Sequence, residues 1–111
     1  MTDLSKPLPY WRRDGTECGQ NEFLELYGNR DYRLLAEEVV GTTRITTVWL
    51  GYDYEFVMGF HERPKPFGTL VSPNGEVDES SYEERYETEA LAREGHARII
   101  DRIRTQIESG S

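Results

Sequence analysis

Residues 44–52, RITTVWLGY, are rich in β-branched and aromatic side chains, which is typical of a β-strand. A similar run covers residues 32–40, and the short segment between the two runs begins at Gly41. Two strand-like runs joined by a short segment with glycine predict a β-hairpin. Because side chains alternate between the faces of a strand, we expect Val48 on a continuously apolar face and Trp49 on the opposite face.

The end of the chain predicts a long amphipathic helix over residues 90–107, with Thr88 as its N-terminal cap. Its apolar side recurs at steps of three and four residues and consists of Ala92, His96, Ile99, Ile100, Ile103 and Ile107. Gly95 lies inside this helix, where glycine is less favourable than alanine by about 1 kcal/mol. We therefore expect the helix to approach a strand closely at Gly95, and we expect residues 109–111 to form a polar tail.

The remaining segments predict short elements around this hairpin and helix. They are a hairpin at 8–18 with Asp14-Gly15 in its turn, a helix at 21–27 capped by Asn21, a long ordered loop at 53–66, and strands at 67–72 and 82–86. Together they predict one α+β domain over residues 1–108. It has an antiparallel sheet of four or five strands, with one long C-terminal helix packed on one face and a short N-terminal helix. The second face of the sheet is expected to stay partly uncovered.

The chain has 111 residues, and 21 acidic against 13 basic side chains give it a formal net charge of −8. This charge argues against direct nucleic-acid binding, which needs clustered Lys and Arg, and it favours encounter with a basic protein surface. Cys18 is the only cysteine, so no internal disulfide can form, which fits a reducing compartment. No stretch resembles a signal peptide or approaches the ~20 apolar residues of a membrane span. We therefore expect a cytoplasmic protein without membrane contact.

Carboxylates are concentrated in residues 76–94, the acidic belt, where only Arg85 and Arg93 oppose them. On an edge strand such carboxylates would be spaced about 6.6 Å apart on each face, similar to the phosphates of a nucleic-acid strand. We expect the belt to occupy the basic groove of a nucleic-acid-handling partner, with nearby aromatic side chains as anchors. The predicted partner-binding residues are Glu76, Asp78, Glu79, Tyr82, Glu83, Glu84, Tyr86, Glu87, Trp49, Tyr52, Tyr54 and Phe56.

Patterns for catalysis and metal binding are weak. Asp53, His61 and His96 are the candidates for a metal or acid–base site, but the two histidines lie far apart in the chain and form no HxH or HExxH pattern. Cys18 has no marked base beside it, and the glycines form neither GxGxxG nor GxxxxGK. No catalytic residue, metal ligand or cofactor is therefore assigned, and we expect that the protein is not an enzyme.

Two stretches resemble a set of small uncharacterised phage and prophage proteins. TTVWLGYDYEF, followed by PFGTLV, is similar to the signature STVWLGLDH…FETMVF of that set, and ERYETEALAREGH resembles its RYSTEEEALAGH segment. The chain departs from the signature at Tyr54, where the set has His, and at Gly68, where it has Glu, so no site that relies on those side chains is carried over. The resemblance implies a phage-associated α+β protein and implies no activity.

Three functional expectations follow. The first is a phage accessory protein that inhibits a host defence complex, such as a CRISPR effector, through an acidic surface that mimics nucleic acid in the host cytoplasm. The second is a structural or assembly protein of the phage particle, which self-associates symmetrically, for example as a homodimer, through the Trp49 face. The third is a small-molecule-binding protein or small enzyme that uses the loop at 53–66.

Overall fold

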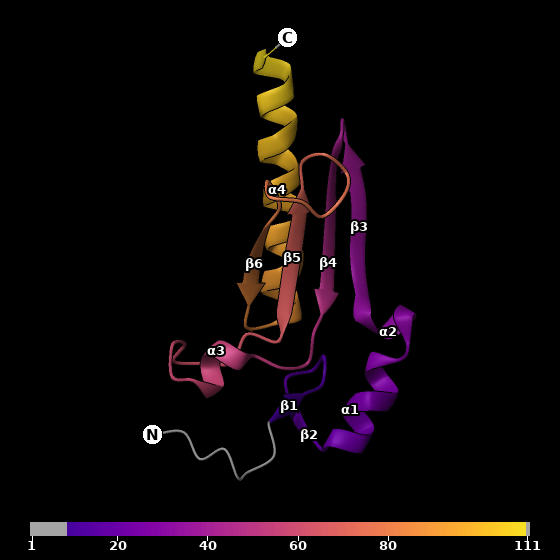
Figure 1. Ribbon diagram of the computed structural model, residues 1–111, viewed down its shortest axis with the longest axis vertical. Coiled ribbons are helices and arrows are strands. Elements are labelled where there is room, and N and C mark those ends of the chain that lie inside the picture. Colours follow the sequence, from indigo (N-terminus) through magenta and orange to yellow (C-terminus); the bar gives the residue numbers. More distant parts are fainter. Residues whose placement is uncertain (1–8, 111) are drawn as a thin grey trace.

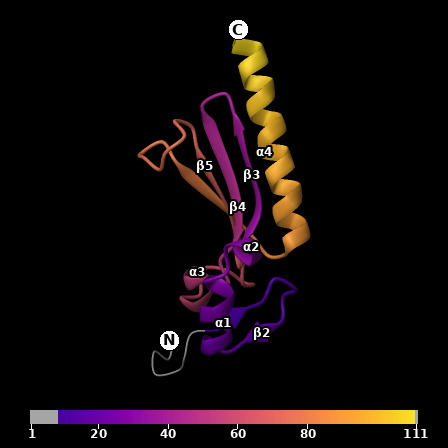
Figure 2. The same ribbon diagram turned by 90° about the vertical axis from the view of Figure 1, so that its right-hand side faces the viewer.

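The computed structural model describes residues 9–110, which form a four-stranded antiparallel sheet in the order β3-β4-β5-β6 (Figure 1). The strands are β3 (Leu34–Val40), β4 (Thr43–Trp49), β5 (Phe67–Ser72) and β6 (Tyr82–Tyr86). The long helix α4 (Glu89–Gly110) packs along one face of this sheet, and no helix of the described residues covers the other (Figure 2). The predicted α+β fold is thus confirmed, with four strands in the main sheet.

The other elements gather at the end of the sheet where β4 stops and β5 begins (Figure 1). They are β1 (Tyr10–Trp11), β2 (Glu17–Cys18), α1 (Gln20–Tyr27), α2 (Arg30–Arg33) and α3 (Tyr54–Val57). β1 and β2 pair as the predicted hairpin, but they form a separate two-stranded sheet. The predicted cap of α1 is wrong, because the helix begins directly after Gly19 and Asn21 lies inside it.

Both strands of the main hairpin are shorter than the sequence predicts. The first begins at Leu34 because Asn29 caps the helical turn α2 before it, its side chain accepting hydrogen bonds of 3.1 and 3.3 Å from backbone N–H groups. The second ends at Trp49 because the chain turns at Gly51, whose φ of 79° lies in the region that favours glycine. The single long loop predicted after it contains the short helix α3.

The boundaries of α4 follow the predicted helix closely. The Thr88 hydroxyl accepts a 3.1 Å hydrogen bond from the first turn, which confirms the predicted cap. The predicted close approach at Gly95 is also confirmed, since a Cβ there would collide with the Tyr86 ring of β6. The helix continues through residues 109 and 110 of the expected polar tail. Residue 111 and the first eight residues of the predicted domain lie outside the described residues.

The core between the sheet and α4 consists of two apolar clusters with a polar layer between them. One cluster contains Ile45, Val71, Ile99, Ile100 and Ile103, and the other contains Phe23, Trp49, Phe67 and Ala92. The buried side chains of Thr47, Thr69 and His96 lie between these clusters along β4, β5 and α4. Thr47 Oγ1 lies 2.5 Å from Thr69 Oγ1 and 2.7 Å from His96 Nδ1, so the polar layer is hydrogen-bonded internally.

Trp49 lies on the covered face of the sheet, which corrects the predicted orientation of β4. Its side chain is 0% exposed and packs in the cluster of Phe23 and Phe67. Its indole Nε1 donates a 2.8 Å hydrogen bond to the backbone carbonyl of Trp11, which ties the N-terminal hairpin to the core. Trp49 is therefore unable to contact a partner in this structure, and the uncovered face carries Val48 instead.

Candidate binding surface around the loop at 53–66

The acidic belt does not form one exposed row, which corrects the predicted partner-binding surface. Its members lie at opposite ends of β6, since the connection from β5 lies at one end of this strand and the connection to α4 at the other (Figure 1). Within β6, Glu83 and Glu84 point to opposite faces. Glu84 lies on the α4 side, where it accepts a 2.7 Å hydrogen bond from the Tyr86 hydroxyl. Burial and this carboxylate raise the pKa of Tyr86 to about 12.

Arginines also neutralise much of the acidic belt. Glu83 lies 3.3 Å from Arg85, and Glu84 lies 3.3 Å from an arginine of α4. Glu89 accepts two hydrogen bonds of 2.8 Å from Arg13 of the N-terminal hairpin, and Glu87 lies 3.8 Å from an arginine of the loop at 53–66. The carboxylates therefore contribute to the structure as ion-pair partners, and a continuous mimic of a phosphate backbone is absent from the described surface.

The other predicted acidic residues lie in the turn between β5 and β6. Glu76 and Glu79 are exposed there. Asp78 accepts hydrogen bonds from the hydroxyl (2.6 Å) and the backbone N–H (2.9 Å) of Ser80 and from the Asn74 side chain (2.9 Å). These bonds, first that of the Ser80 hydroxyl, lower the pKa of Asp78. Asp78 thus organises its own turn.

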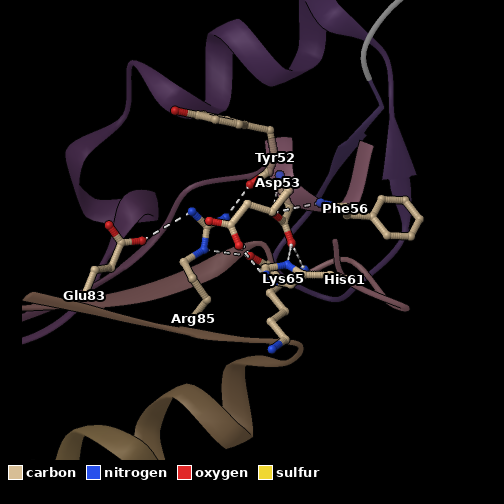
Figure 3. Close-up of polar contacts among 8 residues, drawn as sticks. Tyr52, Asp53, Phe56, His61, Lys65, Glu83 and Arg85 are labelled. Atoms are coloured by element: carbon tan, nitrogen blue, oxygen red, sulfur yellow. Dashed lines mark hydrogen bonds and ion pairs between the residues drawn. The ribbon is translucent and has the colours of Figure 1, made fainter. Parts of the chain in front are cut away.

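Asp53 organises the loop at 53–66, which we call the docking loop. This carboxylate is 2% exposed, and its Oδ1 caps α3 by accepting hydrogen bonds of 3.1 and 3.3 Å from the backbone N–H groups of Glu55 and Phe56. Its Oδ2 accepts from the Lys65 N–H (2.9 Å) and lies 2.7 Å from His61 Nδ1 (Figure 3). Burial alone would raise the pKa of Asp53, but the hydrogen bonds from His61 and the backbone outweigh it and lower that pKa.

Arg85 of β6 fixes both ends of the docking loop to the sheet. Its Nη2 donates to the Tyr52 carbonyl at 2.6 Å and to the Lys65 carbonyl at 2.7 Å, and its Nε donates to the same Lys65 carbonyl at 3.0 Å (Figure 3). Asp53 therefore binds backbone N–H groups of this segment, and Arg85 binds backbone C=O groups at its two ends. These contacts restrict the conformations that the loop can adopt.

The docking loop turns some aromatic side chains inward and others outward. Phe56 packs edge-on against the Trp11 ring, with 5.7 Å between the ring centroids, so this predicted contact residue is half-buried. Tyr54, Met58 and Phe60 are 59%, 54% and 76% exposed. The Met58 N–H donates to the Tyr54 carbonyl at 2.9 Å, which places these two side chains one helical turn apart on the same side.

Two shallow hollows flank the docking loop. The larger, about 400 Å³, is lined by Phe60, His61, Glu62, Arg63, Lys65 and Glu87. The smaller, about 270 Å³, is lined by Tyr52, Asp53, Tyr54, Glu55, Glu83 and Arg85. A pocket that unites Tyr54 and Phe56 with His61 and Arg63 would support the expected small-molecule site in this loop. The structure separates them, since Tyr54 lines one hollow and His61 and Arg63 line the other.

The structure brings together only some of the residues that the sequence offers for a metal or acid–base site. Asp53 and His61 are in contact, and His61 Nε2 lies 2.7 Å from Glu55 Oε2, so both ring nitrogens face carboxylates. His96 belongs to the polar layer of the core. Cys18 is half-buried beside the cluster of Phe23, and burial raises the pKa of its thiol. Within residues 9–110, no group of three or more His, Cys, Asp or Glu is placed to hold a metal ion.

Sequence reasoning missed Arg85, Met58 and Phe60 as functional candidates. The sequence around Arg85 predicts only a charge that opposes the acidic belt, because nothing in its neighbours reveals which carbonyl groups it reaches. A signal for α3 was present, since an aspartate followed by Glu55 two residues later is a common helix start. Met58 follows Tyr54 at the four-residue step of a helix, so finding α3 would also have identified this exposed pair.

Comparisons of the chain with protein-family models, with curated proteins and with solved structures find no match. Among the described residues, none of the helices combines the length and apolar character that crossing a bilayer requires.

Proposed function

We propose that this protein acts by binding another protein, with the docking loop as the contact surface. The observation that carries this proposal is the display of Tyr54, Met58 and Phe60 on a segment that Asp53 and Arg85 hold in place. Aromatic side chains and methionine are enriched in protein interfaces, where they fill pockets of the partner. A preordered loop loses little conformational entropy on binding, so more of the contact energy remains as affinity.

The charge of the chain supports a basic partner surface. The net charge of −8 attracts such a surface over distances longer than a direct contact, and added salt weakens this attraction. The resemblance to small phage proteins makes a nucleic-acid-binding complex of a bacterial defence system the first partner class to test. In this proposal the carboxylates steer the encounter and the docking loop supplies the contact, in place of a nucleic-acid mimic.

The uncovered face of the sheet favours one second candidate, self-association in a structural assembly. Val39 on this face is 60% exposed, and Val48 and Leu70 are half-buried there. A second copy would cover these side chains in a symmetric dimer. Light scattering of the purified chain separates the two candidates, since a monomer at micromolar concentration contradicts self-association and leaves the docking loop as the proposal.

A pair of matched variants tests the docking loop. Met58→Ser/Phe60→Ser removes side chains that are 54% and 76% exposed, and Leu24→Ser/Val77→Ser removes side chains that are 57% and 74% exposed elsewhere. Tagged proteins are incubated with bacterial lysate, and captured proteins are quantified by mass spectrometry at low and high salt.

We expect the wild type and the control to capture the same basic protein, and the loop variant to retain at most about a tenth of it, a loss of roughly 1.4 kcal/mol or more. Because all four side chains are exposed, the melting temperatures of both variants should stay close to that of the wild type. Equal capture by the loop variant and the control would contradict the proposal.

A further inference from the structure

We propose that the smaller hollow beside the docking loop receives one cationic side chain, arginine or lysine, of the protein partner. We call it the tyrosine hollow; it is lined by Tyr52, Asp53, Tyr54, Glu55, Glu83 and Arg85 and has a volume of about 270 Å³. This inference rests on the proposed function and identifies the chemical group that the partner inserts.

Two tyrosine rings form an aromatic corner in the wall of the hollow. The ring centroids of Tyr52 and Tyr54 lie 6.0 Å apart, and the ring planes are perpendicular at 90°. Aromatic faces attract organic cations through their quadrupole, and they also pack against the aliphatic stem of lysine or arginine. The Tyr52 ring also packs edge-on against the buried Phe23 ring, with 6.2 Å between the centroids, so the corner contacts the core.

The charges around the tyrosine hollow favour a cation. Three carboxylates, those of Asp53, Glu55 and Glu83, face one guanidinium, that of Arg85. Glu83 uses Oε1 for its contact with Arg85, and Glu55 uses Oε2 for its contact with His61. The second oxygen of each carboxylate is directed to no donor among the described residues and can accept a hydrogen bond from a guest ammonium or guanidinium.

The floor of the hollow is rigid. Arg85 donates to the Tyr52 and Lys65 carbonyls and cannot turn into the hollow without breaking these hydrogen bonds. Asp53 is engaged by Lys65 and His61, so it supplies negative charge without moving (Figure 3). The guest therefore meets a preformed site, which lowers the entropic cost of binding.

The position of the tyrosine hollow selects a protein side chain over a free amine. Tyr54 lines the hollow and also belongs to the exposed face of the docking loop with Met58. A partner that packs on Met58 can thus place an arginine or lysine between Tyr54 and the carboxylates in the same binding event. A free amine lacks the apolar contact and would bind more weakly.

Short peptides test this site without knowledge of the partner. The probes are Gly-Arg-Gly, Gly-Lys-Gly and the isostere with a neutral side chain, Gly-citrulline-Gly, all N-acetylated and C-amidated, titrated into the 15N-labelled protein while amide shifts are recorded. The test variant is Glu55→Gln/Glu83→Gln, and Glu79→Gln/Glu94→Gln is the matched control, because all four of these carboxylates are exposed.

We expect both cationic peptides to bind with millimolar affinity and to shift the amide signals of residues 52–55 and 83–85. The citrulline peptide should bind at least about tenfold more weakly. The test variant should lose a similar factor of affinity for the cationic peptides, and the control variant should keep its affinity. Equal binding of the citrulline peptide, or equal affinity of the test and control variants, overturns the inference.

The same variants separate this inference from the proposed function. If Met58→Ser/Phe60→Ser loses the partner while the cationic peptides fail to bind, the docking loop stands and the tyrosine hollow is overturned. If the cationic peptides bind as expected but the loop variant captures the partner normally, the proposed function fails and the hollow stands as a cation site, in which a free amine becomes the candidate ligand.

Discussion

Arg13 and Glu89 are separated by 76 positions in the chain and share two hydrogen bonds of 2.8 Å, Nε to Oε1 and Nη2 to Oε2. This bidentate pair joins the turn of the N-terminal hairpin to the first turn of α4. The hydrogen bond from Arg13 is the largest effect on the Glu89 carboxyl and lowers its pKa. The carboxylate also stabilises the helix dipole, because it lies in the first turn of α4.

A double-mutant cycle on Arg13 and Glu89 should give a coupling free energy of about 1 kcal/mol, near the upper end for partly exposed pairs because the contact is bidentate. Urea unfolding of Arg13→Ala, Glu89→Ala and the double variant measures it. The pair of Glu38 and Arg104, whose atoms are 3.8 Å apart at exposed positions, is the control and should show no measurable coupling. Equal coupling in the two cycles would contradict the structural role of Arg13.

His96 should make the stability of the protein depend on pH. Burial lowers the pKa of His96 in the folded state, opposed by Glu38, whose carboxylate lies 3.7 Å from Nε2, and assisted by the positive charge of Arg93. The unfolded chain then binds a proton first, so stability is full above the ordinary pKa of about 6.5 and falls as the pH decreases toward the folded pKa.

Urea unfolding at several pH values between 7.5 and 5 measures this dependence. His96→Gln removes the titrating group and leaves a side chain that can still bond Thr47, so its stability should change less over the same range. A His61→Gln variant, which keeps His96, serves as the control that assigns the pH dependence to His96 and not to the other histidine. A wild type whose stability is constant over this range would refute the buried, neutral state of His96.

Asp53→Asn should destabilise the protein by about 1–3 kcal/mol, because the amide nitrogen faces donors that require an acceptor. Asp31→Asn, at an exposed position, is the control. The low pKa of Asp53 also implies that its contribution is present above the ordinary pKa of about 4 and is lost as the pH falls through the lower folded value. Broadened amide signals confined to residues 54–60 of the variant would confirm that Asp53 orders the docking loop; unchanged stability and spectra would refute it.

Gly95→Ala should destabilise the protein despite the better helix propensity of alanine. The gain of about 1 kcal/mol from propensity is opposed by the collision of the new Cβ with the Tyr86 ring, an overpacking that costs about 1–3 kcal/mol. Gly110→Ala is the control, since no atom lies within 4 Å of a Cβ built there. In the double variant Gly95→Ala/Tyr86→Leu, the loss should be smaller than the sum of the single losses. A stabilised single variant would contradict the close packing.

The hairpin of β3 and β4 and the helix α4 were predictable because their composition and periodicity are local properties of the chain. The sequence does not reveal which side of β4 faces the helix, because both sides carry large apolar residues and the covered side also carries Thr47. Two buried threonines that hydrogen-bond to each other and to His96 Nδ1 look polar in sequence. Only their pairing across β4 and β5 explains why they lie inside.

The candidate site was harder to predict than the fold, because its contacts connect distant segments. The arginines that neutralise Glu84, Glu87 and Glu89 come from α4, the docking loop and the N-terminal hairpin. A count of local charges includes none of these partners. The docking loop itself was predicted as a long ordered segment, but its rigidity depends on Arg85, which belongs to another strand.

The polar layer of Thr47, Thr69 and His96 separates the two apolar clusters under α4 into two compartments, and different side chains shield each compartment from water. The compartment around Ile103 depends on the distal half of the helix, and the one around Trp49 depends on the N-terminal hairpin and α1. Local unfolding of the distal half of α4 would leave the cluster around Trp49 shielded from water. Native-state hydrogen exchange should therefore detect two cooperative units in this small domain, with the docking loop attached to the unit that opens last.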